Sequence, residues 1–107
     1  MSTQNKPAGN QWKVLAAQGR MDALTGAETE RACLEAIKSH ARVALDLRAV
    51  VYMSSAGLRV LLASLKSATS RNGVFALVGP QDAVREVLEM SGFSRIFQIV
   101  DDPSLLA

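Results

Sequence analysis

The chain has 107 residues, of which 49% are hydrophobic and 21% charged, and its formal net charge is +2. This length and composition indicate one soluble globular domain with a single hydrophobic core. Lysine and arginine are spread along the sequence, so we expect no nucleic-acid partner. No apolar run could span a bilayer, and the polar start MSTQNKPAGN lacks a signal peptide's hydrophobic region, which predicts a cytoplasmic protein without membrane attachment.

The first forty residues suggest a lead-in, a strand and a helix. Residues 1–10 are polar and are expected to form a flexible lead-in to a single domain over residues 11–107. Residues 11–18 alternate as a strand does, with Trp12, Val14 and Ala16 on one face. Thr25, followed three residues later by a glutamate, fits a capping box. A first helix is therefore predicted over about residues 25 to 40.

The stretch YMSSAGLRVLL, residues 52–62, is the most informative part of the chain. It follows a short apolar run at residues 43–47 that reads as a buried strand. Ser54 and Ser55 are good N-cap residues for a helix that begins there, because a serine oxygen accepts from the free N–H groups of the first turn. The expected buried stripe is Leu58, Leu61, Leu62, Leu65 and Ala68, and the side chains expected to point elsewhere are Arg59, Ser64, Lys66, Ser67 and Arg71.

The remaining chain continues to alternate between strands and helices. Gly73 stops the central helix, residues 74–78 form a strand, and a helix follows to about residue 90. A last strand is expected over residues 96–100, and then a short helix whose Leu105 and Leu106 fold back. This order predicts an α/β fold: a mixed sheet of four or five strands, completed by the early strand, with about four helices packed against it.

Three motifs in order resemble a known family. Residues 43–68, VALDLRAVVYMSSAGLRVLLASLKSA, resemble the signature of the anti-sigma-factor antagonists, which are single-domain STAS proteins. The steps GRMD at residues 19–22 and MSGF at residues 90–93 resemble two flanking turns of that family. The resemblance implies a STAS-type fold and phosphorylation of the serine at the start of the central helix, here Ser55. It also implies two partners: an anti-sigma factor with a histidine-kinase-like ATP site, and a PP2C-type phosphatase that resets the switch.

We therefore expect an anti-sigma-factor antagonist that binds its serine-kinase partner when unphosphorylated and is released by phosphorylation at Ser55. The expected partner-contact residues are Asp22, Ser54, Ser55, Ala56, Gly57, Arg59 and Lys66. Many family members have aspartate where this chain has Ser54, which keeps an alternative open. In that alternative the chain is a constitutive STAS adaptor, for example in a lipid-transport ATPase or a signalling scaffold, and both serines only cap the helix.

Catalysis, a metal site and a cofactor are not expected. The only histidine, His40, should lie at the far end of another helix from the serines, so neither serine has a base to activate it. SSAG lacks the glycines of a G-x-S-x-G elbow, and no G-x-x-x-x-G-K loop is present to bind ATP. The single cysteine, Cys33, can form neither an internal disulfide nor a metal cluster, and it is expected to act as a small hydrophobic residue.

Overall fold

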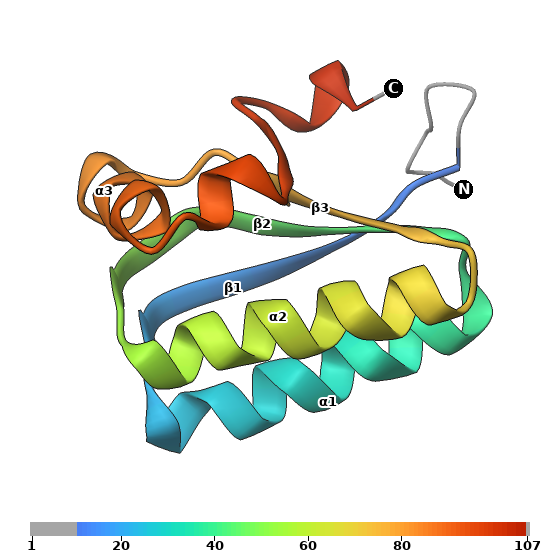
Figure 1. The fold of residues 1–107 in the computed structure, drawn as a ribbon, viewed down its shortest axis with the longest axis horizontal. Helices are drawn as coiled ribbons and strands as arrows, with labels where there is room; N and C mark the ends of the chain where they lie inside the picture. The colour runs from blue at the N-terminus through green and yellow to red at the C-terminus, as the bar shows by residue number, and fades with distance from the viewer. Residues whose placement is uncertain (1–10, 107) are drawn as a thin grey trace.

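Strands and helices alternate along residues 11–106, the part of the chain that the computed structural model describes (Figure 1). Residues 1–10, the expected lead-in, lie outside the described residues. The strands are β1 (Lys13–Met21), β2 (Arg42–Met53), β3 (Val74–Val78) and β4 (Gln98–Val100). The helices are α1 (Ala23–Ser39), α2 (Ser55–Ser70) and α3 (Asp82–Met90), with 3-10 turns η1 (Phe93–Arg95) and η2 (Pro103–Leu105).

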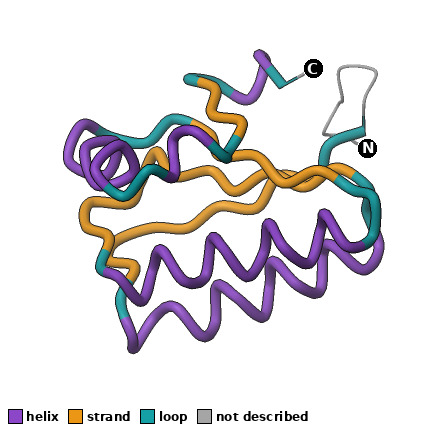
Figure 2. Tube along the Cα trace, in the orientation of Figure 1, coloured by secondary structure: helices purple, strands orange, loops and turns teal. Residues whose placement is uncertain are grey.

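The four strands form one sheet in the order β1-β2-β3-β4, and each pairs parallel with its neighbour. Helices α1 and α2 lie side by side along one face of this sheet (Figures 1 and 2). The predicted α/β class is confirmed. Within residues 11–106 the sheet is parallel rather than mixed, because α1 carries the chain from the end of β1 back to the start of β2. The expected four helices are three α-helices and two single 3-10 turns in this region.

The main core lies between the sheet and the pair α1 and α2, and α3 adds Val84 and Leu88 to it. The opposite face of the sheet carries a smaller cluster around Ala44, Ala76, Val78 and Leu106. Trp12, just before β1, packs against this smaller cluster, whereas Val14 is exposed. Strand β1 contributes Ala17 and Met21 to the main core. Leu106 folds back as expected, whereas Leu105 is exposed.

The junction between β1 and α1 differs from the prediction. Strand β1 continues to Met21, and α1 begins at Ala23 instead of Thr25. Asp22 is the N-cap, because its Oδ1 accepts hydrogen bonds from Leu24 N at 3.0 Å and from Thr25 N at 3.2 Å. Thr25 closes the capping box from inside the helix by accepting from Asp22 N at 3.1 Å. A carboxylate three residues upstream thus took the position predicted for the threonine.

Helix α2 buries a stripe that is rotated from the predicted one. Ser64, which was expected to point away from the core, is fully buried. Its hydroxyl donates to the carbonyl oxygen of Val60 at 2.9 Å, so its polar group is satisfied within the helix. Two residues of the predicted stripe are buried and three are only half-buried: Leu61 and Ala68 against Leu58, Leu62 and Leu65. The full set of buried residues is Gly57, Val60, Leu61, Ser64 and Ala68.

Candidate functional site

We call residues 54–57 the serine turn, and this turn lies where the end of β1 meets the start of α2. Strands β1 and β2 stay paired to their last residues, Met21 and Met53, through two register shifts. The backbone N–H of Ser54 donates to the carbonyl oxygen of Met21 at 3.0 Å. The start of α2 is therefore attached to the β1–α1 junction, which places Asp22 beside the serines in space although they are far apart in sequence.

Ser54 is the N-cap of α2, as one of the two serines was predicted to be. Its Oγ accepts from Ala56 N at 3.1 Å and from Gly57 N at 3.4 Å. The same hydroxyl donates to the carbonyl oxygen of Met21 at 3.3 Å. The side chain is half-buried. The Ser54 hydroxyl thus donates one hydrogen bond and accepts two within the domain, and these bonds hold the turn together.

Ser55 is the first residue of α2 and has a different environment. Its side chain is exposed, and its hydroxyl makes no hydrogen bond to any residue between 11 and 106. The positive end of the α2 dipole lies here, and the first turn of the helix contains no acidic side chain. The hydroxyl is therefore accessible to another protein, in a position where an added negative charge would be tolerated.

Gly57 faces inward and sets how closely α2 approaches the end of β1. A Cβ built on Gly57 would lie 2.7 Å from the carbonyl oxygen of Met21 and 2.9 Å from Cγ of Met53. Real Cβ atoms do not approach other atoms that closely, so only glycine fits here. Ala56 beside it is half-buried. Of the predicted contact residues, Gly57 is therefore the one turned away from the surface.

Asp22 flanks the serine turn as the cap of α1. Its pKa is held below the ordinary value, first by the hydrogen bond from Thr25 N and then by Arg20, whose Nε lies 3.2 Å from its Oδ2. The Arg20 guanidinium also lies over the ring of Tyr52, 4.2 Å from the centroid. Arg20 and Tyr52 face one another across the β1–β2 pair. Asp22 therefore belongs to an ordered cluster next to the serines.

Arg59 and Lys66 extend the site along α2. Both are exposed and share a stripe of the helix with Ser55, since their spacing brings them to the same side. The whole of α2 contains no acidic residue. The structure thus brings together Asp22, Ser54, Ser55 and Arg59 at one end of the molecule, and Lys66 lies further along the same helix face.

Sequence reasoning missed two exposed apolar side chains beside this site. Leu24, in the first turn of α1, is 90% exposed, and Tyr52, near the end of β2, is 43% exposed. Leu24 also lines a hollow of about 720 Å³, together with Gln18, Gly19, Arg20, Asp22, Thr25 and Ala49. One signal was available: Leu24 closely follows the GRMD step, which resembles a turn of the family.

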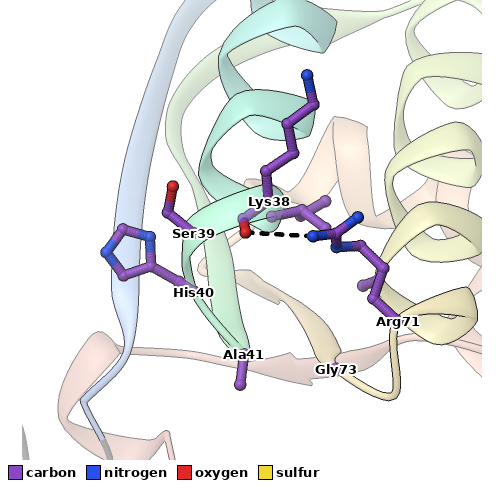
Figure 3. Close-up of a pocket in the computed structure, with 8 residues that line it drawn as sticks. Lys38, Ser39, His40, Ala41, Arg71 and Gly73 are labelled. Atoms are coloured by element: carbon purple, nitrogen blue, oxygen red, sulfur yellow. Dashed lines mark hydrogen bonds between the residues drawn. The ribbon is translucent and has the colours of Figure 1, made fainter.

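A second hollow, of about 280 Å³, lies away from the serines, between the carboxyl-terminal ends of α1 and α2 (Figure 3). Across it, Nη2 of Arg71 donates to the carbonyl oxygen of Lys38 at 3.3 Å, while the Lys38 ammonium points away from this bond. Two helix carboxyl ends disfavour anions, and Arg71 is already engaged there.

Between residues 11 and 106 no cluster of three or more histidine, cysteine or acidic side chains could hold a metal ion. None of the described helices combines the length and the apolar character needed to cross a bilayer.

The fold and the site define a small parallel α/β domain that presents a free serine hydroxyl at a helix start. The chain belongs to the STAS domain family, whose model matches residues 4–104. This result confirms the family suggested by the three sequence motifs.

Among similar proteins, "Putative anti-sigma factor antagonist BtrV" of Bordetella bronchiseptica is 44% identical over 64 residues, covering 60% of this chain. The match spans only 55% of that relative's length. The anti-sigma-B factor antagonist of Listeria monocytogenes is 32% identical over 82 residues, covering 76% of this chain and 72% of the relative. A solved sulfate transporter family protein from Wolinella succinogenes is 18% identical with a TM-score of 0.78, covering 95% of this chain and 86% of that one, and it shares the fold alone.

Proposed function

We propose that this chain is an anti-sigma-factor antagonist that binds a serine-kinase anti-sigma factor and is released when Ser55 is phosphorylated. The observation that carries the proposal is that the two serine hydroxyls differ in hydrogen bonding and in exposure. Ser54 caps α2 and bonds to Met21, while the Ser55 hydroxyl is exposed and unbonded among the described residues. The names of the Bordetella and Listeria relatives support this general function.

Phosphorylation of Ser55 would leave the fold intact. A phosphoserine carries roughly −1.5 to −2 charges at neutral pH, and anions at a helix N-terminus are favoured by about 0.3 to 1 kcal/mol. The cap itself is made by Ser54 and does not need the Ser55 hydroxyl. The effect of the phosphate would therefore fall on a docked partner rather than on the stability of the domain.

A phosphate at this position would be sufficient to release a partner that covers Ser55. A partner surface shaped for a neutral hydroxyl would have to bury the new dianion without a counter-charge, at a cost of several kcal/mol. A loss of about 2.7 kcal/mol already lowers affinity roughly a hundredfold. A PP2C-type phosphatase that removed the phosphate would restore binding, and the switch needs no catalytic group in this chain.

A pull-down from lysate of the native host tests the proposal. The baits are the parent protein, Ser55→Asp, Ser55→Ala and, as a charge-matched control at the other end of α2, Ser70→Asp. We expect a protein with a histidine-kinase-like ATPase fold on the parent, Ser55→Ala and Ser70→Asp, and its loss from Ser55→Asp. Equal retention of one partner by all four baits would refute the switch and favour the constitutive adaptor.

A further inference from the structure

We infer that Arg20, Leu24 and Tyr52 form a docking patch for the partner, and that this partner presents an apolar side chain edged by carboxylates. We call these three residues the Leu24 patch. The inference rests on the proposed function, since it places the kinase-fold protein over both the patch and Ser55. It adds a second, apolar contact that lies outside the serine turn and identifies the chemistry of the opposing surface.

The members of the Leu24 patch lie close together: Arg20 stacks on Tyr52, and Arg20 and Leu24 line the same hollow. Arg20 connects its two apolar members: its guanidinium stacks on the Tyr52 ring and pairs with Asp22 Oδ2, while Asp22 Oδ1 accepts from Leu24 N. An exposed leucine alone is ordinary, but here it stands beside an exposed aromatic ring and an ordered arginine. Because the Arg20 side chain is already held by Asp22 and Tyr52, little of its conformational entropy is lost when a partner docks.

The shape of this region favours a protein over a lipid surface. The hollow of about 720 Å³ is lined by Arg20 and Leu24 themselves, together with Asp22, Gly19 and neighbours. A protruding leucine next to a hollow is complementary to a partner that has its own groove and its own protruding side chain. A bilayer surface is flat on this scale and would leave the hollow unfilled.

The charges around the patch indicate a partner with an acidic edge. The amino ends of α1 and α2 lie next to each other (Figure 1), and neither first turn contains an acidic side chain. Asp22 is neutralised locally by Arg20 and by the N–H groups of α1, whereas Arg59 and Lys66 make no ion pair among the described residues. Carboxylates on the partner would complement this end. A phosphate on Ser55 would remove that attraction as well as obstruct the contact.

Photo-crosslinking in the native host tests the inference and captures the partner in the same experiment. A photoreactive amino acid replaces Leu24 in the full chain, and a matched chain carries it in place of Leu105, which is also exposed but lies on the carboxyl-terminal segment. We expect a crosslink from position 24 to a kinase-fold protein and none to that protein from position 105. No protein crosslink from position 24, or the same products from both positions, would overturn the patch.

Two further measurements separate this inference from the phosphorylation switch. If the position 24 crosslink disappears in the Ser55→Asp background, both proposals are supported, whereas a persistent crosslink supports the patch and refutes the switch. With the captured protein purified, Leu24→Ser should weaken binding at least tenfold and Leu105→Ser should leave it unchanged. Sedimentation with vesicles of phosphatidylglycerol and phosphatidylcholine provides the lipid test, and vesicle binding that Leu24→Ser abolishes would overturn the assignment to a protein.

Discussion

Replacing Gly57 with alanine should destabilise the domain at the point where α2 meets β1. The added Cβ would lie 2.7 Å from the carbonyl oxygen of Met21, 3.1 Å from Met21 Cβ and 2.9 Å from Met53 Cγ. The carbonyl belongs to the backbone of an ordered strand and also accepts from Ser54 N and Oγ. It cannot yield without loss of the hydrogen bonds that hold the serine turn, so α2 itself must shift.

The size of the effect follows from two opposing terms. Overpacking of a filled core costs about 1 to 3 kcal/mol, and the contact with a backbone carbonyl places Gly57→Ala in the upper part of that range, about 2 to 3 kcal/mol. Alanine gains roughly 1 kcal/mol over glycine within a helix, which opposes this cost. The expected net loss for Gly57→Ala is about 1 to 2 kcal/mol. Gly26→Ala is the matched control, because the nearest atom to its Cβ would be Cγ2 of Val60, at 3.2 Å, which is the movable end of a side chain. The gain from alanine in the helix and the cost of moving the Val60 methyl group oppose each other, so the stability of Gly26→Ala should stay within about 0.5 kcal/mol of the parent.

Urea unfolding followed by circular dichroism at 25 °C measures both variants, with thermal unfolding as a second readout. A loss of about 1 kcal/mol corresponds to a fall in Tm of roughly 4 to 8 °C for a domain near this size. The reasoning would be refuted if Gly57→Ala were as stable as the parent, or if Gly26→Ala were the more damaging of the two.

Three further predictions follow from the described contacts. Ser54→Ala should lower the free energy of unfolding by about 1 kcal/mol through loss of the cap, while Ser55→Ala stays within about 0.5 kcal/mol of the parent in the same urea assay. The pKa of Asp22 is lowered in the folded state, so its stabilisation is present above the unfolded pKa of about 4 and is lost as pH falls through the folded pKa. Asp22→Asn keeps the cap and should therefore show a shallower loss of stability in acid titrations. Burial raises the pKa of the Cys33 thiol to about 11, so a thiol reagent at pH about 8 should label Cys33 only after unfolding.

Each of these predictions has a clear contrary result. Equal stability of Ser54→Ala and the parent would show that the Ser54 cap contributes nothing. An unchanged acid profile for Asp22→Asn would remove Asp22 from the account of pH dependence. Rapid labelling of Cys33 in the native state would mean that the core around α1 opens readily.

The central helix and the strand after it were predictable because their signals are local, whereas the strand before it, predicted over residues 43–47, runs on to Met53. Ser54 caps the helix through N–H groups that lie within the next three residues, and the period of apolar positions identifies the helix. The strand at residues 74–78 was placed correctly for the same reason, since a short apolar run is bounded by clear turn residues.

The remaining features depend on contacts that sequence does not display. Asp22 and Thr25 are both suitable N-cap residues for α1 by residue type. Asp22 is the N-cap because its carboxylate accepts hydrogen bonds from the N–H groups of Leu24 and Thr25, which only the folded turn shows. Ser64 can be buried because its hydroxyl donates a hydrogen bond to the carbonyl oxygen of Val60. The pattern of polar and apolar residues alone predicts that Ser64 lies at the surface. Leu24 is exposed although its residue type indicates the core. The proximity of Asp22 to the serines required the hydrogen bond between Ser54 N and the Met21 carbonyl.

The most direct test of the phosphorylation switch is a calorimetric titration of the purified kinase-fold partner with two forms of this chain. One form is the parent, and the other carries phosphate on Ser55 alone, with its position verified by peptide mass spectrometry. The account predicts that phosphorylation weakens binding at least a hundredfold while the circular dichroism spectrum and the urea midpoint stay unchanged. Equal affinity of the two forms would contradict it and leave the STAS domain as a constitutive adaptor.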